Sequence, residues 1–153
     1  MENLILSPAP HIHTKDSSRR IMLDVIIALL PAAVASVVIF GVKALPVLAA
    51  CVIGAVVSEF LVTGRKQTVG DLSAVVTGLL LALNLSTNVP VWQCVIGAAF
   101  AVVIVKCLFG GLGHNFANPA ITARVFMLLA FSAVAGGAQP AGVELVSSAT
   151  PLE

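Results

Sequence analysis

The chain has 153 residues and a formal net charge of +1, and 59% of its residues are hydrophobic whereas only 10% are charged. With a mean hydropathy of +1.08, this composition excludes a soluble domain and predicts an integral membrane protein. The positive residues occur singly or in pairs rather than as a basic stripe, so nucleic acid is excluded as a partner and the lipid bilayer is expected.

The first 20 residues, MENLILSPAPHIHTKDSSRR, carry their positive charges after a short apolar patch. A secretory signal has the reverse order and a longer apolar run, so this segment does not resemble a cleavable signal. We expect residues 1–20 to form a cytoplasmic leader that ends at the membrane.

Five apolar runs follow the leader. An upright transmembrane helix needs about 20 apolar residues, and four runs approach that length: 21–40, 44–62, 91–109 and 119–135. The fifth, 72–85, follows Asp71 as a candidate N-cap and is too short for an upright crossing, so it is either tilted or re-entrant and packed inside protein. The pattern predicts an all-α, polytopic membrane protein with about five transmembrane segments, one of them short or broken, over residues 21–135.

Positive residues near the helix ends determine the expected orientation. Lys15, Arg19 and Arg20 precede the first span, and Arg65 and Lys66 follow the second. If the short segment crosses the membrane, residues 136–153 lie outside, and the segments expected in the cytoplasm are 1–20, 63–70 and 110–118. If the short segment is re-entrant, the side of residues 136–153 is reversed. Five crossings is the more economical interpretation.

Five ionisable residues lie in or near the spans: Asp24, Glu59, Asp71, Lys106 and Arg124. A charge at membrane depth is costly and usually pairs or lines a functional cavity. Most of the five lie close to a helix end, where long side chains reach the interface, which leaves Arg124 and Asp71 as the main candidates. Each fits a pair between helices or subunits better than an ion path.

The cysteines and His114 do not predict a metal site. Cys51, Cys94 and Cys107 lie within apolar runs and lack Cys-x-x-Cys spacing, so we expect them to pack as small apolar side chains rather than to form disulfides. His114 has no second His or Cys at the spacing of metal ligands.

The loop FGGLGHNFANPA, residues 109–120, combines glycines with two asparagines. Pro119 suits the first position of the next helix, which makes Asn118 its N-cap. Glycines allow a backbone to approach a flat ligand, and the amides of Asn115 and Asn118 offer donors and acceptors to a heterocycle. A plain helix-connecting turn is the alternative.

The closing segment VSSATPLE places Thr150 before a proline. Pro151 favours extended backbone at Thr150, and small neighbours leave its hydroxyl open. Such a threonine is an accessible acceptor for covalent modification, although a Ser/Thr-rich turn gives the same pattern.

Three stretches together resemble one family. They are SPAPHIHTKDSSRRIMLDVIIALLPA near the start, DLSAVVTGLLLALNLSTNVPVW with FGGLGHNFANPAITARVF in the middle, and SSATPL at the end. In this order they resemble the D subunit of the Rnf complex, an ion-translocating ferredoxin:NAD oxidoreductase, and the related B subunit of the sodium-pumping NADH:quinone reductase. The resemblance covers essentially the whole chain, and the short leader is closer to the Rnf branch.

The resemblance implies a covalent flavin on Thr150. In the family, a flavin transferase attaches FMN through its phosphate to the last threonine of the motif Asp-x-x-Ser/Thr-Gly-Ala-Thr. The matching stretch here is ELVSSAT, in which Ser148 and Ala149 lie beside the acceptor. Glu144 and Ser148 replace the family's Asp and Gly, and both replacements keep charge or small size.

The resemblance also implies a second flavin, riboflavin, held within the membrane. Asn115 and Asn118 are its candidate contacts by this match, and Arg124 is a further candidate. The family fold consists of two similar helical halves. We therefore expect this sequence to cover the N-terminal half, with residues 136–153 as an extracytoplasmic, flavin-bearing segment.

The expected function is that of a membrane subunit, in a bacterial or archaeal cytoplasmic membrane, that passes electrons between flavins and iron–sulfur carriers while the complex moves Na+ or H+. The resemblance implies the A, B, C, E and G subunits of Rnf as partners, and no complete active site or nicotinamide site on this chain. Two alternatives follow from the residues alone. The broken helix and the Gly/Asn/Pro-rich loop favour a secondary transporter or channel, and a purely structural role is the other.

Overall fold

The computed structural model describes residues 17–64, 70–111 and 114–131 of the chain. The described residues form helices and no strand. The helices are α1 (Ser18–Phe40), α2 (Ala44–Thr63), α4 (Ser73–Asn84), α5 (Val91–Ala99), the π-helix η1 (Phe100–Cys107) and α6 (Pro119–Ala130). The predicted all-α fold is therefore confirmed for this part of the chain.

Within the described ranges, α1 and α2 are long and apolar enough to cross a bilayer, with 23 and 20 residues. Their ends differ from the predicted spans 21–40 and 44–62 by at most three residues. Together with a composition that is 59% hydrophobic, these helices identify the fold as that of a helical membrane protein.

The remaining helices are shorter than α1 and α2, and the predicted length of α6 was wrong. α4 agrees with the predicted short segment, and α5 continues into η1 as one helix up to Cys107. α6, predicted to extend over 119–135, has only 12 residues, because Phe131 takes up extended backbone with φ −134° and ψ 116°. Residues beyond 131 lie outside the described part. The structure therefore contains two half-length helices, α4 and α6, whereas the sequence predicted only one, over residues 72–85.

The start of α4 also differs from its prediction. Asp71 was the candidate N-cap, but Leu72 occupies that position, in the left-handed region with φ 60° and without a side-chain capping hydrogen bond. The helix consequently begins one residue later than predicted. Ser73 becomes its first residue.

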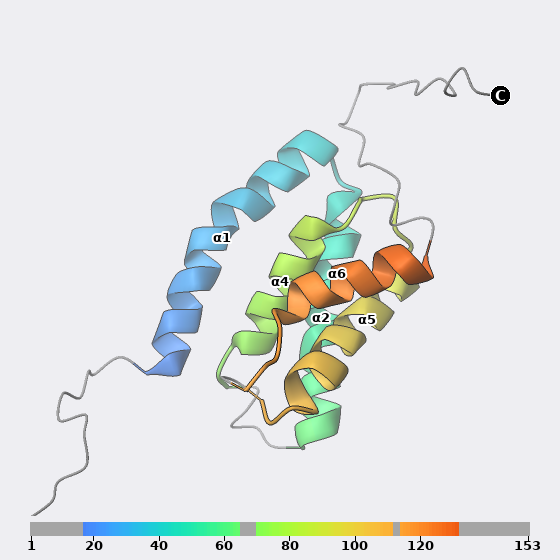
Figure 1. The fold of residues 1–153 in the computed structure, drawn as a ribbon. Coiled ribbons are helices and arrows are strands. Elements are labelled where there is room, and N and C mark those ends of the chain that lie inside the picture. Colours follow the sequence, from blue (N-terminus) through green and yellow to red (C-terminus); the bar gives the residue numbers. More distant parts are fainter. Residues whose placement is uncertain (1–16, 65–69, 112–113, 132–153) are drawn as a thin grey trace, which may run out of the picture.

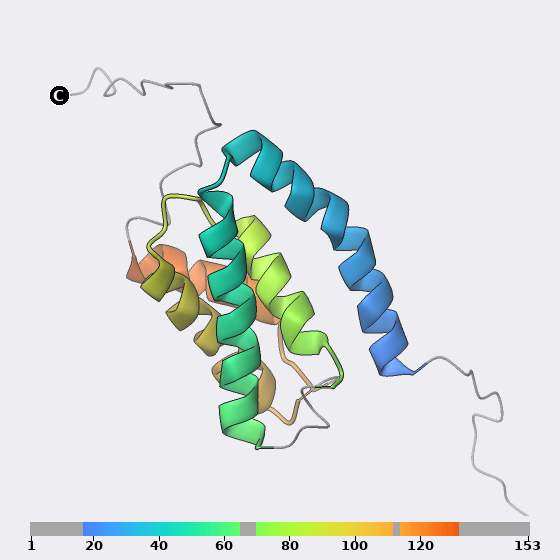
Figure 2. The ribbon, with the colours of Figure 1, turned by 180° about the vertical axis from the view of Figure 1, so that it is seen from behind.

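Figures 1 and 2 show α2 on one side of α4 and α5, with α6 crossing them on the other side. Cys51, Ala55, Leu81 and Ala98 are fully buried in the core of this arrangement. At Gly78, a Cβ atom would lie 2.7 Å from the carbonyl oxygen of Cys51, so only glycine permits the observed approach of α4 to α2. Small residues at the contact are typical of helices that pack within membranes.

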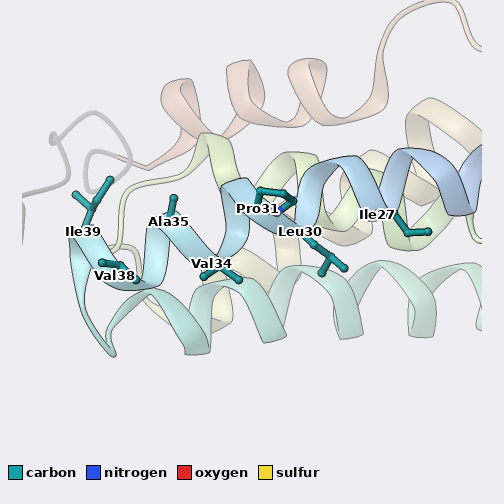
Figure 3. A pocket seen from close by; sticks show the side chains of 7 residues that line it. All are labelled: Ile27, Leu30, Pro31, Val34, Ala35, Val38 and Ile39. Carbon is teal, nitrogen blue, oxygen red and sulfur yellow. The ribbon is translucent and has the colours of Figure 1, made fainter.

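α1 lies at the side of the bundle, next to α4, and none of its residues is buried. Pro31 removes one backbone donor within the helix, and α1 bends along its length (Figure 2). An apolar groove of about 700 Å³ runs along α1 (Figure 3), lined by Ile27, Leu30, Pro31, Val34, Ala35, Val38 and Ile39. Because this lining has no ionisable side chain, the groove offers packing surface rather than chemistry.

The ends of α1, α2 and α4 lie at the two opposite ends of the bundle (Figure 1). The start of α1, the end of α2 and the start of α4 lie at one end. The connection from α1 to α2 and the connection from α4 to α5 lie at the other. α4 therefore runs antiparallel to α2, and its 12 residues lead across the bundle rather than back to the same end.

Candidate functional site: a buried lysine beside a polar cavity

A charged pair lies inside the bundle. Lys106 of η1 donates hydrogen bonds from Nζ to Glu59 Oε1 of α2 and to Ser73 Oγ of α4, the latter at 2.6 Å. Lys106 is 2% exposed and Glu59 is fully buried. Charges at such depth are stable only when they pair and hydrogen-bond, so this contact couples three helices at one point.

The π-helical geometry of η1 determines the register in which Lys106 meets its partners. Leu108 N–H, directly after η1, donates to Val103 O at 3.0 Å, five residues back rather than four. Relative to an α-helix, the wider turns of a π-helix rotate the later residues around the helix axis. Short π-helical stretches are rare and often occur at functional sites.

The start of α4 supplies the third member of the cluster. Ser73 is its first residue and is buried, and its hydroxyl accepts from Lys106. Thr77, one turn later, donates from Oγ1 to the carbonyl oxygen of Ser73 at 2.9 Å. Both side chains are buried polar groups on the face of α4 that is directed to the pair.

A cavity of about 170 Å³ lies beside the pair. It is a partly open cavity between parts of α1, α4 and η1 and the segment that leads into α6. Its lining residues are Met22, Ser73, Val76, Thr77, Leu80, Lys106, Asn115, Asn118 and Pro119. Polar groups from three separate elements therefore meet one cavity with apolar side walls.

The two predicted asparagines both line this cavity, but they differ in chemistry. Asn118 is the N-cap of α6, as predicted, and its Oδ1 accepts from Ala120 N at 3.0 Å and Ile121 N at 3.4 Å. Its oxygen is therefore engaged by the helix. Asn115 Oδ1 is buried and has no hydrogen-bond partner among the described residues, which leaves an acceptor for a ligand.

The other residues that the sequence singled out are not among the described residues that line the cavity. Arg124 is half-buried on α6 and is not part of the lining, and Asp71 is half-buried just before α4. Thr150, Ser148 and Ala149 lie outside the described residues. The predicted flavin-bearing segment consequently stays a prediction.

Glu59 and Lys106 were misjudged from sequence, because both lie near the end of an apolar run, where a long side chain usually reaches the interface. The structure instead buries both. One available signal was an acid and a base, each inside a separate apolar run, in a chain with few charged residues.

Comparison with known proteins gives close relatives. The chain is 47% identical over 98% of its length to the D subunit of a Na+-translocating ferredoxin:NAD+ oxidoreductase complex of Acetobacterium woodii, covering 48% of that protein. It is 37% identical over 96% of its length to the D subunit of a proton-translocating ferredoxin:NAD+ oxidoreductase complex of Clostridium ljungdahlii, covering 46% of it. The D subunit of an ion-translocating oxidoreductase complex in Methanosarcina acetivorans is 39% identical over 86% of the chain, which covers 47% of that protein.

The chain spans about half the length of these curated relatives. The match to the family pattern is not confined to one motif, because it extends from residue 5 to residue 153. It includes every helix described above and the cavity between them. The chain therefore belongs to the NQR2, RnfD, RnfE family.

Proposed function

We propose that this chain is part of the membrane subunit of an Rnf-type complex. In this role it passes electrons between flavins and iron–sulfur carriers, coupled to translocation of Na+ or H+ during ferredoxin:NAD oxidoreduction. The observation that carries the proposal is the 47% identity to the Acetobacterium woodii protein over 98% of the chain. The names of the relatives specify Na+ in one case and protons in another, so the proposal includes both ions.

The proposed surroundings are a multi-subunit complex in a bacterial or archaeal cytoplasmic membrane. Its partners are the A, B, C, E and G subunits of Rnf, together with a flavin transferase. The relatives' names, which designate the D subunit of a complex, support the presence of partners. The exposed apolar side chains of α1 and α2 support a position against lipid or other membrane subunits.

The proposed covalent cofactor is FMN, esterified through its phosphate to Thr150. The stretch ELVSSAT supports this assignment, with Ser148 and Ala149 beside the acceptor. A threonine before a proline favours extended backbone, which presents the hydroxyl to a transferase. Bound flavin would supply the electron-transfer chemistry, and the protein would supply its position and electrostatic surroundings.

An in-gel fluorescence experiment tests this assignment. The complex is purified from the organism that encodes it, so that its flavin transferase is present, and is separated on a denaturing gel under ultraviolet light. We expect a fluorescent band at the mass of the subunit that disappears in Thr150→Ala and persists in Val146→Ala, because residue 146 stands at an unspecified position of the motif. A wild-type subunit without fluorescence, or fluorescence that survives Thr150→Ala, contradicts the proposal.

Riboflavin is the second proposed cofactor, and the cavity supplies a test of fit. Asn115 Oδ1 is a buried acceptor without a partner in the described part of the chain, as a site for a polar heterocycle requires. Asn118 fits less well, because its oxygen already caps α6. Arg124, the third candidate, does not line the cavity. The residues present therefore fit riboflavin through Asn115 rather than through the asparagine pair.

A secondary transporter or channel is the second candidate function. It is favoured by the two half-length helices, α4 and α6, which both begin at the polar cavity. Interrupted helices around a polar site are typical of transporters. The same gel experiment separates the candidates, because a transporter without a redox role needs no covalent flavin.

A further inference from the structure

The exposed side of α1 carries one continuous stripe with a charged end and an apolar end. Its residues follow each other at spacings of four or three, which is the spacing of one helix face: Arg20, Asp24, Ile27, Pro31, Val34 and Val38. All six are exposed. Leu29 and Ala33, on the opposite side of the helix, are half-buried, and α4 lies next to α1. The apolar part of the stripe forms the groove shown in Figure 3.

The dimensions of the stripe match those of one leaflet of a bilayer. At 1.5 Å per residue, the groove from Ile27 to Ile39 is about 18 Å long, whereas one leaflet contributes about 15 Å of hydrocarbon. Arg20 and Asp24 precede the groove by about 10 Å and about 5 Å, and the polar headgroup layer is about 5–8 Å thick. One phospholipid can therefore extend along the whole stripe.

The charges at the start of the stripe favour a headgroup that carries both signs. A guanidinium has five N–H donors, so Arg20 can bind a phosphate oxygen in addition to a contact within the protein. Asp24, one turn later, has no hydrogen-bond or ion-pair partner in the described part of the chain. A carboxylate so close to the hydrocarbon repels an anionic headgroup, whereas an ammonium group would pair with it.

We propose that the exposed stripe of α1 binds a phospholipid with an amine headgroup, such as phosphatidylethanolamine, in the leaflet at which α1 begins. One acyl chain lies in the groove, the phosphate pairs with Arg20, and the ammonium group pairs with Asp24. This proposal depends on the membrane location of the chain and is independent of any flavin.

A further protein segment is the competing occupant of the groove, because the chain spans about half the length of its curated relatives. The side chains along the groove favour lipid instead. Ile27, Leu30 and Val34 are large and branched, whereas helix contacts within membranes favour small residues, as at Gly78 between α4 and α2.

Photo-crosslinking tests the proposal in the complex purified from the organism that encodes it. An amino acid with a photoreactive diazirine replaces Val38 in the groove or, as the control, Val57, which is exposed on α2 outside the groove. The complex is reconstituted into vesicles that contain phosphatidylethanolamine and phosphatidylglycerol in equal amounts, and is then irradiated. Mass spectrometry of the subunit identifies the molecule attached at each position.

We expect position 38 to attach phosphatidylethanolamine about two- to fivefold more often than phosphatidylglycerol, as one exposed ion pair would give, and position 57 to attach both equally. Equal attachment of the two lipids at position 38, or a preference for phosphatidylglycerol there, overturns the proposal. Attachment of a protein segment at position 38 also overturns it and identifies the groove as a protein interface.

Substitutions of Asp24 test the origin of the headgroup preference. Asp24→Asn removes the charge at nearly constant size and should abolish the preference at position 38, whereas Asp24→Glu keeps the carboxylate and should retain it. Asp71→Asn, a neutralisation outside the stripe at the same end of the bundle, should leave the preference unchanged. A preference that survives Asp24→Asn, or that disappears equally in Asp71→Asn, overturns the role of Asp24. If the replacement of Val38 prevents assembly, the probe replaces Ile27 in the same groove, with the same expected results.

Discussion

Lys106 and Glu59 depend on each other, because each is buried where a lone charge has no solvent. Lys106→Met leaves the Glu59 carboxylate without its partner, and we expect the complex to be less stable by about 3–5 kcal/mol. The double variant Glu59→Leu/Lys106→Met should recover most of this loss. Thermal unfolding in detergent, followed by size-exclusion chromatography, measures both changes.

The comparison between the two variants is decisive for this prediction. If Lys106→Met unfolds at the wild-type temperature, the buried carboxylate does not need the lysine. If the single and double variants are equally unstable, the loss comes from packing volume rather than from an unpaired charge. Val105→Ala, a buried change on the same helix, reports the cost of packing loss alone.

Asn118 stabilises the start of α6 by accepting hydrogen bonds from Ala120 N and Ile121 N. Asn118→Ala removes this cap, and we expect a loss of about 1 kcal/mol, seen as a lower unfolding temperature. Asn118→Asp keeps the acceptor and should retain most of the stability. Equal stability of Asn118→Ala and Asn118→Asp would show that the cap contributes nothing.

These residues show which parts of the site were predictable. The cap at Asn118 follows from local chemistry, because Asn before Pro at the start of an apolar run is a recognisable helix start. The burial of Lys106 does not, because it depends on the π-helical register of η1 and on α4 covering the side chain. The number of residues between Lys106 and the end of its apolar run predicts neither the π-helical register nor the packing of α4 over the side chain.

At the scale of elements, the contact between α2 and α4 depends on Gly78. A Cβ there would lie 2.7 Å from Cys51 O and 2.8 Å from Val52 Cα, both backbone atoms that cannot move independently. Gly78→Ala therefore has to separate the helices, and we expect a cost of about 1–3 kcal/mol in thermal unfolding of the complex.

Gly97 provides the matched control for this contact. A Cβ at Gly97 meets the side chain of Met127, with the sulfur at 2.7 Å, and that side chain is flexible. Gly97→Ala should therefore cost clearly less than Gly78→Ala. The reverse order would show that the spacing between α2 and α4 is not limited by backbone contact.

The agreement between predicted and observed elements follows the length of the apolar runs. α1 and α2 were predictable within three residues, because an uninterrupted apolar run of about 20 residues has few alternatives. α6 was not, because the apolar run continues past Ala130 while Phe131 leaves the helix and packs edge-on against Trp92, with ring centroids 5.5 Å apart. That contact joins α6 to α5 and is invisible in sequence.

For the whole molecule, the arrangement of helix ends connects the cavity to the orientation in the membrane. The start of α1, which carries Arg19 and Arg20, lies at the same end of the bundle as the end of α2 (Figure 1). Positive residues favour the cytoplasmic side. The lining residue Met22 lies on the first turns of α1, so the cavity is expected near that side.

This orientation is tested by cysteine accessibility. In a variant whose three cysteines are replaced by alanine, single cysteines are placed at Ser17 and His114 at one end, and at Val42 and Asn88 at the other. All four positions are exposed. We expect a membrane-impermeant maleimide to label the Val42 and Asn88 positions in intact spheroplasts, and the Ser17 and His114 positions only after lysis, because basic residues flank the latter end.

The pattern of labelling separates the alternatives by position. The opposite result at all four positions would reverse the orientation and place the cavity near the outside. Asn88 labelled together with Ser17, rather than with Val42, would show that the short helix α4 is re-entrant, which contradicts its course across the bundle. Labelling after lysis at all four positions is the control, because it shows that each thiol is reactive and that protection in spheroplasts arises from the membrane.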